Sequence, residues 1–219
     1  LCKQFHKLKQ YLKLLFNHLS INQNKRLFDR RWHIYRTKLC EFKKEKKMKA
    51  VEELELNNQD HYKLKMDIGI DQDSRQNIAN GLSQILADSY CLMIMMHNYH
   101  WNVRGKNFRQ IHLLTEEQYE EIFGAIDEIA ERIRSLGFLA PGSLKEFSDL
   151  SHIDEPNSKA TENEMLAHLL KGHEHIAKHA RKIIAMADDV DDEATADLLT
   201  ERVEVHEKSA WMLRSMLEE

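Results

Sequence analysis

Apolar residues recur at intervals of three, four and seven positions between residues 107 and 136. This spacing predicts an amphipathic helix with one apolar seam, interrupted only at the polar Gln118. The seam consists of Ile111, Leu114, Ile122, Ile126, Ile129, Ile133 and Leu136. Asn107 stands where an N-cap is expected, and Gly137 stands where the residue after a helix end is expected. We therefore predict a helix over residues 107–136.

Similar patterns predict three further long helices and one short helix. Asp71 or Asp73 is suited to cap the first helix, and Thr161 with Glu164 forms the pattern of a capping box at the start of the third. The predicted ranges are about 73–103, 161–187 and 192–217, with a short helix over 143–150. The whole chain has only 7 Gly and 2 Pro, and such a scarcity of helix-breaking residues favours an all-α fold.

Side chains that can bind metal ions occupy a second face of the predicted 107–136 helix. His112 and Glu116 are four positions apart, as are Asp127 and Glu131, so the members of each pair lie side by side on the helix. The two pairs are separated by 15 residues, which is roughly 22 Å along a helix axis. A single chain therefore cannot bring all four side chains to one ion.

Two copies of this helix in antiparallel would bring the pairs together. One register places His112 opposite Glu131 and, at the same time, Glu116 opposite Asp127. The two-fold axis then falls between residues 121 and 122, and the reciprocity is that of an isologous dimer. Two bulky residues lie near this axis, Tyr119 and Phe123. The alternative is that these acids are ordinary solvated groups on a helix surface.

His100 is a further candidate ligand with an alternative interpretation. It continues an apolar stripe in the predicted first helix, where a histidine packed in the core is the usual finding. The earlier members of the stripe are Ile78, Leu82, Ile85, Ser89, Leu92 and Met96.

Three motifs resemble the Dps family, the mini-ferritins. They are His100-Trp101-Asn102 followed by His112, the segment Asp127-Glu128-Ile129-Ala130-Glu131-Arg132, and the segment from His206 to Arg214. The resemblance covers about Met66 to Glu219. It implies a ferritin-like four-helix bundle with a short extra helix between the second and third helices. It also implies a hollow shell of twelve subunits, with ferroxidase centres between pairs of subunits.

The resemblance also implies roles for individual residues. His100 and His112 would supply nitrogen ligands, while Asp127 and Glu131 would supply carboxylates from the neighbouring subunit. Glu116 would lie near the second iron, and Trp101 would lie against the site as an oxidisable group. The implied reaction is oxidation of Fe(II), by hydrogen peroxide or by dioxygen, followed by storage of ferric mineral, which protects DNA from oxidative damage. Carboxylates with few imidazoles suit iron.

Three acids near the start of the last helix, Asp192, Asp197 and Glu201, have the spacing of acids that line an entry pore in the family. A carboxylate ring would concentrate cations at such a pore. Acids are, however, also favoured in the first turn of any helix, because they interact well with the helix dipole.

A histidine stripe on the third helix consists of His168, His175 and His179. It is either an incidental transition-metal site or a set of solvated side chains. In the sequence, only Glu164 offers a carboxylate at matched spacing on this helix.

Charge divides the chain into two parts. Residues 1–65 contain 17 Lys and Arg against 7 Asp and Glu, whereas residues 66–219 contain 15 against 29. The net charges are therefore +10 and −14. We expect 66–219 to be the folded domain and 1–65 to be disordered or absent from the native product, with Met66 as a candidate start. If present, the basic segment would bind DNA through phosphates, without sequence preference.

Other features limit the compartment and the competing functions. Three cysteines without a CxxC motif favour the reducing cytoplasm, and no stretch of 18 apolar residues could span a membrane. None of the 13 histidines follows a glutamate by three positions, which argues against a conventional ferritin with its di-iron site inside one bundle. The remaining alternatives are a nucleoid protein that acts through its basic segment and a shell without catalytic activity.

Overall fold

The computed structural model describes residues 66–217, and over this range the protein is all-α, as predicted. Residues 66–217 form five helices: α3 (Gln72–Asn102), α4 (Phe108–Ser135), α5 (Leu144–Leu150), α6 (Glu162–Asp188) and α7 (Glu193–Leu217). The predicted basic segment 1–65 lies outside the described residues. Within residues 66–217, no helix is both long enough and apolar enough to cross a membrane.

The helix ends agree with the sequence prediction to within one or two residues because local capping sets them. Asp71 caps α3 by accepting the Ser74 N–H at 3.0 Å. Thr161 and Glu164 form the predicted capping box at the start of α6. Gly137 has φ of 97° and follows α4, where a left-handed residue satisfies the last carbonyls of the helix.

Asn107 is the N-cap residue of α4, as predicted, but a contact with another helix holds it in place. Asn107 holds the N-cap position, but its side chain makes no capping hydrogen bond. Instead, the Asn107 backbone N–H donates to Glu162 Oε1 at 3.0 Å. The start of α4 is therefore tied to the first turn of α6, a contact between distant parts of the chain that local sequence cannot reveal.

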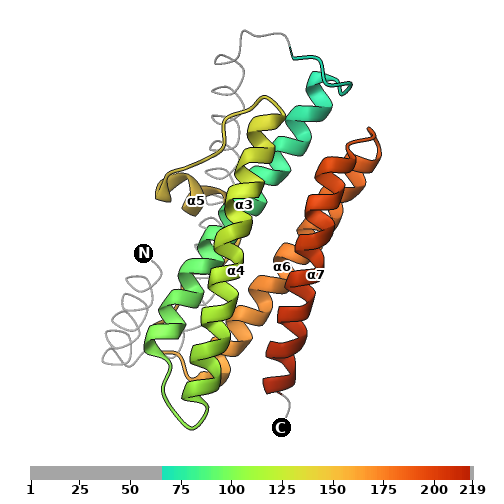
Figure 1. The fold of residues 1–219 in the computed structure, drawn as a ribbon. Helices are drawn as coiled ribbons and strands as arrows, with labels where there is room; N and C mark the ends of the chain where they lie inside the picture. Colours follow the sequence, from blue (N-terminus) through green and yellow to red (C-terminus); the bar gives the residue numbers. More distant parts are fainter. Residues whose placement is uncertain (1–65, 218–219) are drawn as a thin grey trace, which may run out of the picture. The chain divides into compact units, whose positions relative to one another are not determined.

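The long helices pack as two hairpins, α3 with α4 and α6 with α7, and α3 also packs against α6 (Figure 1). The short α5 lies against α3. All seven residues of the predicted α4 seam are buried, and so is Gln118, the polar residue that interrupts it. The seam therefore faces the core, which leaves the opposite face of α4, with its acidic residues, on the surface.

Two glycines allow α3 and α6 to approach closely. A Cβ atom added at Gly172 of α6 would lie 2.6 Å from Cδ1 of the buried Leu92. A Cβ atom added at Gly81 of α3 would lie 2.7 Å from Cγ1 of Ile183. Larger residues at either position would push the helices apart, and this contact positions the polar cluster between α3 and α6 described below.

Candidate metal centre

His100 and His112 form a stacked pair of imidazoles where α3 ends and α4 begins. Their ring centroids are 3.7 Å apart and the ring planes differ by 17°. The Nδ1 atom of His100 lies 2.8 Å from the backbone oxygen of His112, and Nδ1 of His112 lies 2.9 Å from the backbone oxygen of His100. A carbonyl oxygen can only accept a hydrogen bond, so each Nδ1 must donate. Each neutral ring therefore carries its free lone pair on Nε2.

This arrangement is the one that a metal-binding histidine needs. A histidine ligand usually donates its other ring N–H to a carbonyl or a carboxylate, which fixes the tautomer and orients the ring. Here the two residues fix each other. His100 is only 8% exposed, so it is buried, as the alternative interpretation of a core histidine predicts. Its reciprocal hydrogen bonds nevertheless leave a ligand atom available.

Aromatic side chains surround the imidazole pair. Tyr119 meets His100 edge-on, with centroids 5.4 Å apart, and Phe108 stacks on His112 at 5.1 Å. His97, which the sequence did not single out as a ligand, lies 4.3 Å from the ring of Tyr119 and 5.4 Å from that of Trp101. Burial first, and then the nearby His100, lower the pKa of His97, so the His97 imidazole is neutral at neutral pH.

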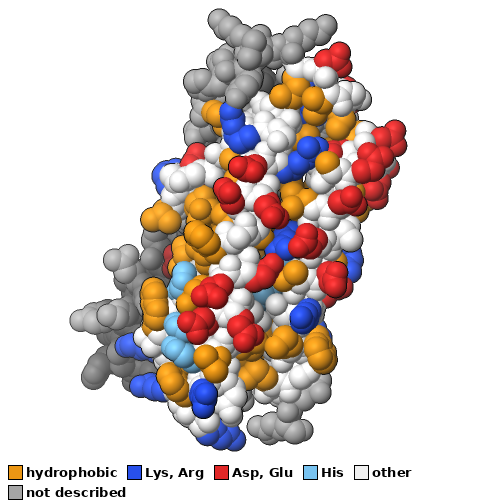
Figure 2. Space-filling model, viewed as in Figure 1, with side chains coloured by type: hydrophobic (Ala, Val, Ile, Leu, Met, Phe, Trp, Pro, Cys, Tyr) orange, Lys and Arg blue, Asp and Glu red, His pale blue; other side chains and the backbone are white. Residues whose placement is uncertain are grey.

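The structure does not bring all the predicted ligands together within one chain. Glu116 is half-buried and lies one turn beyond His112, whereas Asp127 and Glu131 are exposed. Because α4 is a single uninterrupted helix, Asp127 lies roughly 22 Å along the axis from His112. Figure 2 shows acidic side chains along the surface of α4, with histidine side chains at the surface beside them.

The three acids proposed for a pore have different surroundings. Asp192 is buried and accepts hydrogen bonds from the Thr195 backbone N–H at 3.1 Å and from Arg132 Nη2 at 2.5 Å. It therefore caps α7 and links this helix to α4, so its carboxylate does not face solvent. Asp197 and Glu201 are exposed, and only these two remain available to line an entry route.

The histidine stripe on α6 divides into two groups. His168 Nδ1 is 2.7 Å from the hydroxyl of Tyr99, whereas His175 and His179 face the buried Asp88 of α3. Their carboxylate partner comes from another helix, so the spacing of residues along α6 could not reveal it. Glu164 is instead engaged in the capping box.

Comparison with known proteins places this fold in a family. The model of the ferritin-like domain matches residues 79–219. The DNA protection during starvation protein 2 of Bacillus anthracis is 38% identical over 136 residues, which is 62% of this chain and 93% of the relative. The chain belongs to the Dps family. A low temperature-induced protein of Nostoc is 40% identical over 156 residues, which is 70% of this chain and 87% of the relative.

Solved Dps structures confirm the predicted fold. Dps from Vibrio cholerae, described as a member of a broad superfamily of ferritin-like diiron-carboxylate proteins, has a TM-score of 0.68 and 28% identity. The match covers 72% of this chain and 99% of the Vibrio protein. Dps from Bacillus brevis has a TM-score of 0.65 and 34% identity, with 67% and 98% covered. The short helix α5 between α4 and α6 completes the predicted ferritin-like bundle.

Proposed function

We propose that this protein oxidises Fe(II) at dinuclear sites shared between two subunits and stores the ferric product. The observation that carries the proposal is the His100–His112 pair, in which each Nδ1 is held by the other residue's carbonyl and each Nε2 keeps a lone pair. These two imidazoles are oriented as ligands, but Asp127 and Glu131 of the same chain lie too far along α4 to complete an iron site with them. The pair is therefore half of such a site. Family membership and the diiron-carboxylate relatives support iron as the metal.

In the proposed dimer, the second half of the site comes from the antiparallel partner. Asp127 and Glu131 are exposed on α4, and the register that places Glu131 opposite His112 also places Asp127 opposite Glu116. Phe123, near the proposed two-fold axis, is 65% exposed. An aromatic side chain of this size is a typical element of a subunit contact. We propose that such dimers assemble into a shell of twelve subunits.

Iron is both substrate and cargo in the proposed reaction. Two Fe(II) ions each give one electron to a hydrogen peroxide molecule, whose O–O bond breaks and whose oxygens take up two protons to leave as two waters. Because both electrons come from one site, no hydroxyl radical is released. The carboxylates would stabilise the Fe(III) product. Trp101, which is 71% exposed, would be an oxidisable side chain close to the site.

Fe(II) would reach the shell interior past Asp197 and Glu201, whose exposed carboxylates would raise the local cation concentration. This proposal omits Asp192, which is buried in the N-cap of α7. We place the protein in the cytoplasm, where Fe(II) and DNA occur together and where reduced cysteines are stable.

Substitution of the proposed ligands tests this function. His112→Ala should abolish most peroxide-driven Fe(II) oxidation, because one of the two imidazoles is lost. Asp127→Asn and Glu131→Gln should have the same effect. Size-exclusion chromatography of each variant should show an unchanged oligomer. If all three variants oxidise iron at the wild-type rate, the proposed site is wrong.

DNA binding through the basic segment is a second candidate function, favoured by the charge of +10 on residues 1–65 against −14 on residues 66–219. Such binding would rest on neutralised phosphates and would weaken steeply with salt. A gel shift should compare the full chain with a form that starts at Met66, at low and moderate salt. We expect only the full chain to bind, and equal binding by both forms would remove residues 1–65 from the account.

A further inference from the structure

A second polar cluster lies between α3 and α6, apart from the proposed iron centre. It is built around Asp88, whose side chain is fully buried. Asp88 precedes His100 by 12 residues on α3, which is roughly 18 Å along the helix. Its position in the core is unusual, because an ionised carboxylate is seldom fully buried unless it is paired or binds a metal.

The two oxygens of Asp88 have different partners. Oδ1 accepts hydrogen bonds from the Ser151 hydroxyl at 2.8 Å and from the His152 backbone N–H at 2.6 Å. Oδ2 faces imidazoles, with His175 Nε2 at 3.2 Å and His179 Nδ1 at 4.0 Å. One oxygen is thus fixed by the chain that follows α5, and the other is directed toward possible ligands.

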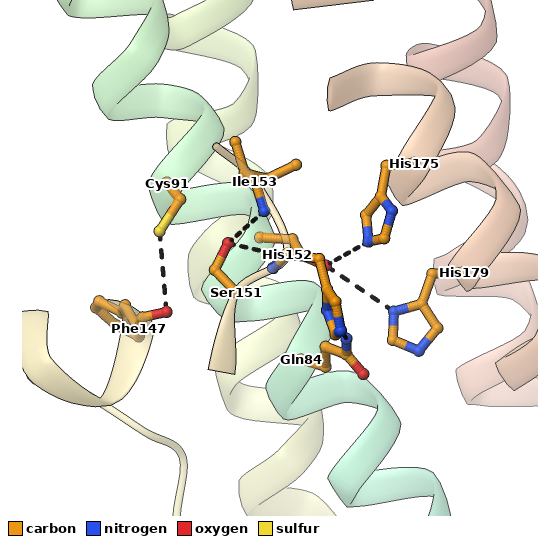
Figure 3. Close-up of polar contacts among 9 residues, drawn as sticks. Gln84, Cys91, Phe147, Ser151, His152, Ile153, His175 and His179 are labelled. Carbon is orange, nitrogen blue, oxygen red and sulfur yellow. Dashed lines mark hydrogen bonds and ion pairs between the residues drawn. The ribbon is translucent and has the colours of Figure 1, made fainter. Parts of the chain in front are cut away.

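The imidazoles come from two separate segments. Figure 3 shows His175 and His179 extending from α6 toward the loop that carries His152. One ligand atom from each of Asp88, His152 and His175 lies within 4.8 Å of the other two. The Gln84 side-chain amide of α3 contacts the His152 ring, so that the ring is held next to the cluster. The sequence prediction missed this arrangement because Asp88 and His175 are 87 residues apart.

We propose that Asp88, His152 and His175 form a binding site for a divalent transition-metal ion such as Zn²⁺ or Co²⁺, with His179 as a fourth ligand. Two or three imidazoles with one carboxylate are a donor set typical of these ions. The ion would link α3, the connection after α5 and α6. The proposal does not depend on the iron centre, with which it shares no residue.

The geometry of the cluster fits such an ion. For metal–ligand distances of roughly 2.0–2.1 Å, neighbouring ligands in a tetrahedral site are about 3.3 Å apart. The 3.2 Å separation of Asp88 Oδ2 and His175 Nε2 already matches this edge. An ion would replace the proton that His175 now donates, while both hydrogen bonds to Oδ1 would remain as outer-shell support.

Two further observations point to a ligand. Nδ1 of His179 is buried and has no hydrogen-bond partner, although it lies 4.0 Å from the Asp88 carboxylate. An unsatisfied buried nitrogen is costly, and a metal ion would satisfy it. A small cavity of about 40 Å³ adjoins the cluster, lined by His152, His168 and His175 among others, which leaves space for an ion or a water molecule.

The charge state of Asp88 also suits metal binding. Burial alone would raise the pKa of this carboxyl, but His175, His179, the His152 backbone N–H and the Ser151 hydroxyl together hold the pKa well below its ordinary value. Asp88 is therefore ionised at neutral pH and supplies a negative charge to the ion.

Titration of the full-length protein with Co²⁺ and Zn²⁺ tests the proposal. The His112→Ala variant serves as background, so that the proposed iron centre does not contribute to the signal. We expect one ion per subunit, a visible Co²⁺ absorption spectrum of a tetrahedral nitrogen and oxygen site, and a higher melting temperature with Zn²⁺. His175→Gln and His152→Gln should each weaken Zn²⁺ binding about tenfold or more. Both residues are at least partly exposed, so these variants should fold.

His168→Gln is the matched control. His168 shares the stripe with His175 on α6, but its Nδ1 is engaged by the Tyr99 hydroxyl, so this variant should bind Zn²⁺ like its parent. Equal loss in all three variants, or wild-type affinity in His175→Gln and His152→Gln, would overturn the proposal. In a background with His112 intact, His175→Gln should leave peroxide-driven iron oxidation unchanged, which separates this site from the proposed iron centre.

Discussion

Removal of the Asp192 carboxylate should destabilise the fold. The sequence alone suggests a different role for this residue, as one of three acids that line an entry pore. Its side chain is only 2% exposed. Oδ1 accepts from Arg132 Nη2 at 2.5 Å and from the Thr195 N–H at 3.1 Å, and Oδ2 accepts from the Thr195 hydroxyl at 2.6 Å. One carboxylate thus joins the end of α4 to the start of α7.

The expected loss follows from these contacts. Loss of an N-cap costs about 1 kcal/mol, and removal of one member of a buried ion pair costs about 3–5 kcal/mol. Since the Arg132 side chain is 18% exposed, the lower end of that range applies. We expect Asp192→Ala to reduce the free energy of unfolding by about 3–4 kcal/mol. Asp192→Asn keeps the cap and loses the charge, so its expected loss is smaller than that of Asp192→Ala by about 1 kcal/mol.

Urea unfolding followed by circular dichroism, at matched protein concentration, measures both effects. Asp197→Ala is the control, because this exposed residue lies on the same helix and should change stability by only about 0.5 kcal/mol. The reasoning is refuted if Asp192→Ala unfolds at the same urea concentration as Asp197→Ala.

Three further predictions concern iron entry, helix packing and acid stability. Asp197→Asn should slow iron uptake at low Fe(II) without loss of assembly, and an unchanged initial rate would count against the entry route. Gly172→Ala should lower the free energy of unfolding by about 1–2 kcal/mol, because the cost of overpacking against Leu92 exceeds the gain in helix propensity. Gly124→Ala is the control and should not lower it, because no atom lies within 4 Å of the added Cβ. Burial above all holds the pKa of His206 well below 6.5, so below that pH only the unfolded chain takes up this proton. The contribution of His206 to the free energy of unfolding should then fall by about 1.4 kcal/mol for each pH unit below 6.5. Urea unfolding at pH 7.5 and 5.5 should show a smaller loss of stability in His206→Leu than in the wild type.

The helices could be predicted because their determinants are local. The α4 seam follows from apolar spacing alone, and the starts of α3 and α6 follow from Asp71 and from Thr161 with Glu164. The start of α4 was also predicted at Asn107, but its contact with Glu162 of another helix could not be predicted from local sequence.

The candidate sites show the same limit more strongly. Spacing on α4 predicts that one chain holds only half of an iron centre, but the reciprocal bonds between His100 and His112 depend on how the loop between α3 and α4 turns. The sequence indicates that Asp88 is buried, because it lies three residues after Ile85 and four before Leu92 on an apolar stripe. Its imidazole partners come from the tertiary fold.

Hybrid shells test the central claim most directly. A His112→Ala subunit keeps Asp127, and an Asp127→Asn subunit keeps His112, so a mixed dimer contains one complete site and one with both defects. Each variant alone should be inactive in peroxide-driven iron oxidation, and shells dissociated and reassembled from an equal mixture should regain about one quarter of wild-type activity, because half of randomly formed dimers are mixed. Reassembled mixtures as inactive as the separate variants would contradict a centre shared between subunits.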